Sequence, residues 1–247
     1  MNFEQTKKLT ALLAFCLPLV SACSVPQMRV SEGLQQEASA LPVTGRSAFR
    51  ASLGQEKGFG FGTYQLQGIQ RGWTRSIGSG KLLPWQITQA YQPYSFSLTD
   101  MEQGQTWPVQ VATILNAATV EVGGWSVNLD KQREFLKAGF ESPESGVWQL
   151  SLADPGHYTE RHHFVGKLWN EQEEITVQPL YRFEGKSLPS ATALGYEFSR
   201  NGQVLASVQT MNNGKVWLRT SLSPDMKRVL ASASAALLLY QQLGEEE

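Results

Sequence analysis

A run of twelve uncharged residues near the C-terminus constrains the fold of this chain more than any other feature. The run VLASASAALLLY covers residues 229–240 and carries no charge on any helical face. Ser223 can cap the start of a helix, Pro224 suits its first turn, and Gly244 can mark its end. A helix that is apolar on every side must be buried, and this one is too short to span a bilayer. We therefore expect it to be enclosed by, or pressed deep against, the rest of the domain.

Alternating apolar and polar residues before that helix predict a β-rich domain. β-Branched and aromatic residues recur with a period of two and are separated by turn residues at fairly regular spacing. One segment, residues 130–139, instead resembles a short helix that ends at Gly139. The predicted fold is an all-β barrel or sandwich that encloses or packs one apolar C-terminal helix. The expected strands lie within residues 47–53, 58–73, 94–98, 107–114, 119–129, 147–152, 174–183 and 194–222.

Residues 194–222 predict a three-stranded meander with two tight turns. Asn201-Gly202 and Asn213-Gly214 supply residues that tolerate positive φ, as type I′ turns require. A two-residue turn at the first pair would place Phe198 opposite Leu205 and Tyr196 opposite Ser207.

The same region carries a resemblance at the level of the fold. A meander that reads YEF, NG, ASV, NNGK and VWL, followed by an aspartate near the start of an apolar helix, is similar to the tubby C-terminal-like and LURP-one-like domains. The similarity covers roughly residues 180–243. In those families a strongly bent sheet closes as a barrel around one apolar helix, so the resemblance implies that architecture. Tubby domains bind phosphoinositides through basic residues. This sequence shows no clear basic cluster, so that activity does not carry over.

The first 22 residues have the three parts of a secretory signal peptide. Two lysines form the charged start, residues 9–20 are apolar and uncharged, and small residues follow. The sequence Val20-Ser21-Ala22-Cys23 resembles the lipobox of bacterial lipoproteins. The resemblance implies cleavage between Ala22 and Cys23, a diacylglycerol on the Cys23 sulfur, and acylation of the new amino group. Ser24, the second mature residue, implies sorting to the outer membrane.

Cleavage at that position would leave Cys23 as the remaining cysteine, because Cys16 leaves with the signal peptide. An intramolecular disulfide or a paired-cysteine metal site is then excluded. The full chain has 21 basic and 22 acidic residues, and removal of two lysines and one glutamate leaves 19 and 21. This balance gives no basic field that would attract nucleic acid. We expect a signal peptide over residues 1–22, a lipidated tether over 23–45, and one β-rich periplasmic domain over 46–247.

Few residues suggest catalysis. The stretch HYTERHHF contains all three histidines, so His157, His162 and His163 are weak candidates for metal ligands, although their spacing matches no zinc signature. The glycine-rich stretches GFGFG (58–62) and GSGK do not match a P-loop. Alternating glycine and phenylalanine in GFGFG instead indicates a strand where backbones approach closely or bend. No GxSxG motif occurs.

Aromatic residues offer a candidate binding surface. Arg71 and Arg75 flank Trp73, and Trp85 follows in an aromatic-rich segment. Such residues recur at protein interfaces, but most tryptophans in a β domain belong to its core, and we expect that here for the majority.

These features favour a non-catalytic lipoprotein on the periplasmic side of the outer membrane, with a role in binding or scaffolding. Its expected partners are the membrane, through the lipid anchor, and other envelope proteins; no cofactor and no nucleic acid are expected. Two alternatives remain. One is an envelope hydrolase or metal-dependent enzyme that uses residues 154–163, and the other is a barrel that binds a lipid or another apolar ligand.

Overall fold

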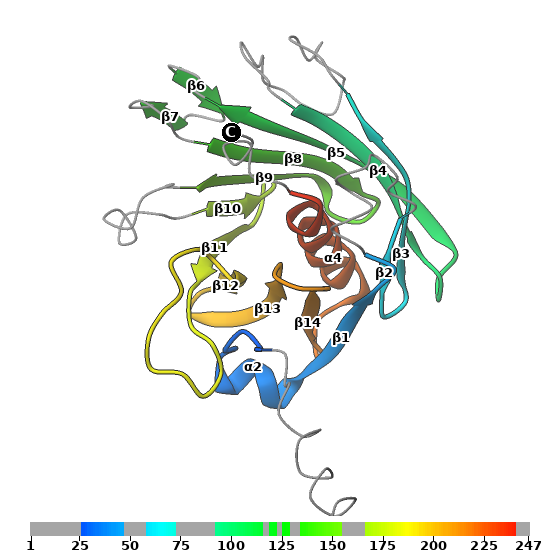
Figure 1. The fold of residues 1–247 in the computed structure, drawn as a ribbon. Coiled ribbons are helices and arrows are strands. Elements are labelled where there is room, and N and C mark those ends of the chain that lie inside the picture. The colour runs from blue at the N-terminus through cyan, green and yellow to red at the C-terminus, as the bar shows by residue number, and fades with distance from the viewer. Residues whose placement is uncertain are drawn as a thin grey trace, which may run out of the picture.

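Twelve antiparallel strands form a closed barrel around one helix (Figure 1). This is a computed structural model, and it describes residues 26–46, 58–72, 92–115, 119–122, 125–128, 134–154 and 166–240. The barrel strands follow the order β1-β14-β13-β12-β11-β10-β9-β8-β5-β4-β3-β2, and β6 with β7 forms a separate two-stranded sheet. The prediction of an all-β domain that encloses the C-terminal helix is confirmed, and the barrel is the form it takes.

The secondary-structure elements begin and end as follows: α2 Glu32–Glu37, β1 Ala38–Thr44, β2 Gly60–Phe61, β3 Tyr64–Arg71, β4 Gln92–Asp100, β5 Gln105–Leu115, β6 Thr119–Val122, β7 Trp125–Asn128, β8 Glu134–Ser142, β9 Gly146–Asp154, β10 Gly166–Trp169, β11 Glu174–Leu180, β12 Gly195–Arg200, β13 Gln203–Gln209, β14 Lys215–Arg219 and α4 Pro224–Leu239. Strand β1 closes the barrel, because it pairs with β14 on one side and with β2 on the other.

Strand β4 shows why these sequences form a barrel with an apolar interior. Tyr94, Phe96 and Leu98 are buried, whereas Ser95 and Ser97 between them are only partly buried. This alternation places apolar side chains on the inner face of the barrel and polar ones on its outer face. The inner side chains belong to the same core cluster as the helix residues from Val229 to Leu239, so α4 fills the barrel.

Helix α4 begins as predicted and ends earlier than predicted. The Ser223 hydroxyl accepts a hydrogen bond from the Met226 amide at 3.2 Å, and Pro224 occupies the first turn. The helix ends at Leu239, where Tyr240 takes an extended conformation and its amide donates to the Ala236 carbonyl at 3.1 Å. The expected end at Gly244 is therefore wrong, and Gly244 itself lies outside the described residues.

The helix predicted at residues 130–139 is wrong from Glu134 onward, where β8 begins. Leu136, Ala138 and Phe140 are buried on the inner face and stand opposite Thr113, Val111 and Val109 of β5. The tertiary pairing with β5 and β9 decides this segment over its local composition. The preceding residues 130–133 lie outside the described part.

The meander of β12, β13 and β14 is confirmed, but its register differs from the prediction. Asn201 and Gly202 have the expected positive φ values of 52° and 77°. An irregularity between Phe198 and Ser199 shifts the pairing by one residue, so Phe198 stands opposite Ala206 and Tyr196 opposite Val208. In the second turn, positive φ falls at Asn212 (56°) and Gly214 (93°) instead of at Asn213-Gly214.

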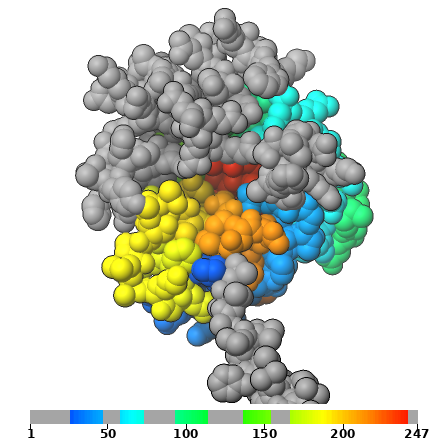
Figure 2. Space-filling view, in the orientation of Figure 1, coloured from blue at the N-terminus to red at the C-terminus, as the bar shows by residue number. Residues whose placement is uncertain are grey.

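The expected tether over residues 23–45 is wrong for residues 26–44, which belong to the folded domain. Met28 and Leu34 are buried, α2 packs on the outside of the barrel, and β1 is a barrel strand. In the space-filling view these blue residues lie against the orange strands and the yellow loop (Figure 2). The local sequence of β1 gives little sign of a strand. Its conformation is decided by pairing with β14, which is distant in the chain, and with β2, which follows it. The folded domain therefore includes residues 26–44 and does not start at residue 46.

The GFGFG stretch confirms the prediction of close backbone approach. A Cβ atom on Gly58 would lie 2.2 Å from the Leu66 carbonyl oxygen, and one on Gly60 would lie 3.0 Å from that of Tyr64. Phe59 and Phe61 are buried in the core.

Candidate functional site

Most residues singled out in the sequence lie outside the described part of the structure. This group comprises Ala22, Cys23, Ser24, Trp73, Arg75, Trp85, His157, His162 and His163. Their predicted roles in lipidation, sorting, surface binding and metal binding therefore stay predictions. Three other tryptophans, Trp107, Trp148 and Trp217, are buried, as expected for core residues.

Arg71, the described member of the proposed aromatic binding surface, is directed toward the end of helix α4. Its Nη2 donates to the Leu239 carbonyl at 3.1 Å, and its guanidinium lies 5.1 Å from the centre of the Tyr94 ring. The Tyr94 hydroxyl donates to the Ala236 carbonyl at 2.8 Å. A cation beside the last carbonyls of a helix stabilises that end of its dipole. Arg71 and Tyr94 thus hold the C-terminal end of α4 inside the barrel.

A second polar cluster holds the N-terminal end of α4. Asp225 is buried in the first turn, and its carboxylate accepts hydrogen bonds from Ser142 and from Ser145, the latter at 2.6 Å. Trp148 donates its indole N–H to Ser145 Oγ at 2.8 Å, and Asn170 donates to the Ser145 carbonyl at 2.8 Å. A carboxylate at a helix N-terminus is favoured by the helix dipole and by such hydrogen bonds. The turn between β8 and β9 is thereby fixed to the helix.

Arg228 and Ser232 extend this cluster along the next turns of α4. Arg228 is buried, contacts the Gln105 side chain, and forms an ion pair with Glu144 at 2.8 Å. Trp107 donates its indole N–H to Ser232 Oγ at 2.7 Å, and Ser232 donates to the Arg228 carbonyl at 2.9 Å. The recess beside these residues is small, with room for about one water molecule, far below the ~300 Å³ at the lower end for ligand pockets. The cluster positions the helix, and its polar groups satisfy one another.

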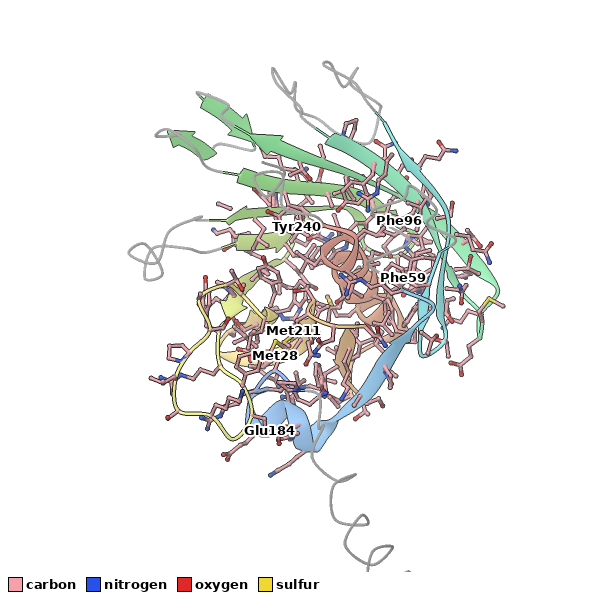
Figure 3. All side chains as sticks on the ribbon, viewed as in Figure 1. Met28, Phe59, Phe96, Glu184, Met211 and Tyr240 are labelled. Carbon is pink, nitrogen blue, oxygen red and sulfur yellow. The ribbon has the colours of Figure 1, made fainter. Side chains whose placement is uncertain are left out.

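The N-terminal segment over residues 26–37 forms a separate apolar cluster on the outer side of the barrel. Met28, Val30 and Leu34 pack there with Leu194 and Trp217, and Met211 lies against them. Figure 3 shows Met28 and Met211 close together and Glu184 farther out on the same side. The Met28 amide donates to Gln209 Oε1 at 2.8 Å, which links this cluster to β13.

Charged groups complete the attachment of the N-terminal segment. Arg219 is buried, contacts the Glu37 carboxylate, and donates through Nε to the Val204 carbonyl at 2.9 Å. Burial raises the pKa of Glu197, and the nearby Ser31 hydroxyl acts on it in the opposite direction. These contacts hold the chain against the barrel from its first described residues.

Sequence reasoning missed both the cluster around Asp225 and the attachment of the N-terminal segment. The signals available were Asp225 in the first turn of an apolar helix and the apolar residues Met28, Val30 and Leu34 in an otherwise polar stretch. In the described ranges, no group of three or more histidine, cysteine, aspartate or glutamate side chains could hold a metal ion. No helix among the described residues has the length and apolar character of a membrane span.

No protein-family model, no curated protein and no solved structure matches this chain.

Proposed function

We propose that this protein is an outer-membrane lipoprotein that faces the periplasm and acts there by binding or scaffolding, without catalysis. The observation that carries the proposal is the sequence Val20-Ser21-Ala22-Cys23 after an apolar run of signal-peptide length. A chain processed at this position would begin with Cys23, three residues before the first described residue, Pro26. Multiple acyl chains would hold it stably at a membrane, whereas a single acyl chain gives only marginal binding.

The filled barrel supports a role at the outer surface of the domain. Helix α4 occupies the interior, where all of its residues from Val229 to Leu239 are buried. Along β3, β4 and β11 the outward positions are polar, for example Gln67, Ser97 and Gln178, which is opposite to the apolar outer face of a membrane-spanning barrel. A partner would therefore meet the exposed side chains of the barrel and its loops. Because α4 fills the interior, the hypothesis of a barrel that binds an apolar ligand has less support than the hypothesis of a scaffolding domain.

Mass spectrometry of the N-terminal peptide tests the anchor. Expression of the full chain in a bacterium with two membranes should yield a mature protein that begins at a tri-acylated Cys23 and fractionates with the outer membrane. Cys23→Ser should block processing, whereas Cys16→Ser, in the peptide that is removed, should leave the mature product unchanged. A Cys23→Ser chain that is still cleaved and membrane-bound contradicts the proposal.

Crosslinking in intact cells tests the scaffolding role. The lipidated protein should be recovered with one or more envelope proteins at constant stoichiometry. A hydrolytic activity or a bound metal that disappears when His157, His162 and His163 are replaced by alanine would instead favour an enzyme.

A further inference from the structure

Five cationic residues lie on segments that meet near the first described residues, although they are dispersed in the sequence. We call this group the N-terminal basic face, and its members are Arg29, Arg46, Arg182, Lys186 and Lys215. They come from the N-terminal segment, from the residues just after β1, from the loop after β11, and from the first residue of β14. The linear sequence shows no basic cluster, but folding brings the segments that carry these cations together.

Hydrogen bonds to the first described residues bring these cations together. Lys215 Nζ donates to Gln27 Oε1 at 2.8 Å, and the Arg29 amide donates to the Arg182 carbonyl at 2.8 Å. Arg46 Nη1 donates to the Thr210 carbonyl at 2.7 Å, in the turn whose Asn212 side chain donates to the Pro26 carbonyl at 3.4 Å.

The loop over residues 181–190 adds the remaining cations and an apolar tip. Lys186 Nζ lies 4.9 Å from the centre of the Phe183 ring, and Arg182 forms a bridge with Pro189. Leu188, beside that bridge, has 79% of its surface exposed. Glu184 on this loop carries a negative charge, and its amide donates to the Gln27 carbonyl at 2.9 Å. Figure 1 shows the yellow loop beside α2, and Figure 2 shows it on the same face as the blue N-terminal segment.

The chain length between Cys23 and Pro26 fixes the distance of this face from a lipid anchor. Three residues span at most roughly 11 Å even when fully extended. The headgroup region of each leaflet is about 5–7 Å thick, so acyl chains on Cys23 would bring Pro26 to the headgroups. The residues bonded to the Pro26–Arg29 segment are then within reach of the membrane surface, and charge can decide whether they contact it.

We propose that the N-terminal basic face is a docking surface for a bilayer that contains anionic phospholipids, with Leu188 inserted among the headgroups. The proposal deepens the proposed function and rests on acylation of Cys23. The mature chain is net acidic, with 19 basic and 21 acidic residues after loss of the signal peptide, so cations at this face give the domain a charge asymmetry. Each lysine or arginine near an anionic surface changes membrane affinity by about fivefold. The anchor and the basic face together fix one orientation of the barrel, with its remaining surface turned toward the periplasm.

Fluorescence quenching in reconstituted vesicles tests this orientation. Mature lipidated protein carries no free thiol once Cys23 is acylated, so the thiol introduced by Leu188→Cys can be labelled selectively. The matched control is Met101→Cys, because Met101 is 64% exposed in the turn between β4 and β5. In vesicles that contain phosphatidylglycerol, the label at position 188 should lose access to acrylamide, and the label at position 101 should keep it.

Two charge variants separate a docking surface from a general effect of charge. The double variant Arg182→Ala with Lys186→Ala should restore acrylamide quenching of the label at position 188. The same result is expected for the unchanged charges on neutral phosphatidylcholine vesicles, or in 1 M salt, which shortens the Debye length to ~3 Å. Lys167→Ala with Arg200→Ala removes the same charge from β10 and the far end of β12 and should have no effect. Equal quenching at positions 188 and 101 with Cys23 acylated overturns the docking surface alone. Absence of acylation on Cys23 overturns the docking surface and the proposed function together.

Discussion

Replacement of Leu238 by alanine measures how much the packing of α4 inside the barrel contributes to the free energy of unfolding. Leu238 is 1% exposed. The change removes three carbons, worth about 0.8 kcal/mol each, or roughly 2.4 kcal/mol of transfer free energy. A Cβ atom added at Gly214 would lie 2.7 Å from Leu238 Cδ2 and 3.1 Å from Val43 Cγ2, so backbone and β1 pack closely around this side chain. Because the site cannot easily collapse, a cavity contribution raises the total to about 3–5 kcal/mol.

Urea denaturation of the mature chain without its lipid, followed by tryptophan fluorescence, provides the assay. Leu238→Ala should lower the midpoint with little change in slope and lower the melting temperature by roughly 10 °C. Leu188→Ala is the control, because that leucine is 79% exposed and its loss should change stability by less than about 0.5 kcal/mol. Leu238→Asp, which places a charge in the core, should prevent folding. A loss below about 1 kcal/mol for Leu238→Ala would refute the claim that the helix is enclosed.

Three further changes test buried or partly buried charges, each by denaturation against the unchanged chain. Burial lowers the pKa of Lys137 to about 8, so between pH 8 and 10.5 the unfolded chain binds a proton that the folded chain does not. The free energy of unfolding should therefore rise with pH over that window by up to ~3 kcal/mol. Lys137→Met should remove this rise. An equal rise in the variant would assign the effect to another group. Burial raises the pKa of Glu197, so the free energy of unfolding falls as pH rises through the ordinary carboxyl range and stays lower at pH 7. Glu197→Gln should therefore be more stable than the unchanged chain at pH 7. A less stable variant contradicts this interpretation. Asp225→Ala removes two hydrogen bonds to a buried carboxylate and should cost about 2–4 kcal/mol, whereas a change under ~0.5 kcal/mol would show that the cluster does not hold the helix.

The predictions that succeeded rest on patterns that span whole elements. Residues 229–240 carry no charge, so burial on every side was the available solution for a helix in water. The alternation in β4 and the Asn201-Gly202 turn likewise follow from local chemistry. Such features are read from neighbouring residues, because the periodicity of side chains is set by the backbone itself.

The predictions that failed concern segments whose partners are far away in the sequence. Residues 134–139 look locally helical, yet β5 and β9 supply a ladder on both sides. Ala38–Thr44 contains alanines and a proline and has a weak strand pattern, but β14 pairs with it across more than 170 positions. The one-residue shift at Phe198 follows from an irregularity that puts Leu205 and Ala206 both in the core. Local propensity does not decide these cases, because long-range burial outweighs it.

The candidate sites divide along the same line. Cys23 and its neighbours form a linear motif that a processing enzyme would read from an extended chain, so the sequence alone defines it as a candidate. The Asp225 cluster and the N-terminal basic face join residues from four or more separate segments. Strand pairing and the docking of residues 26–37 bring these side chains together.

The sequence by itself determined that the chain carries a β-rich domain, a helix that must be buried, and a lipobox-like motif before the domain. The tertiary structure decided that the sheet closes into a barrel, that residues 26–44 are part of the folded domain, and that the segments carrying five dispersed cationic residues meet beside the N-terminal segment. The physical reason is the range of the interactions: periodicity and turn chemistry act between neighbours, whereas barrel closure and charge clustering depend on contacts between residues far apart in the chain.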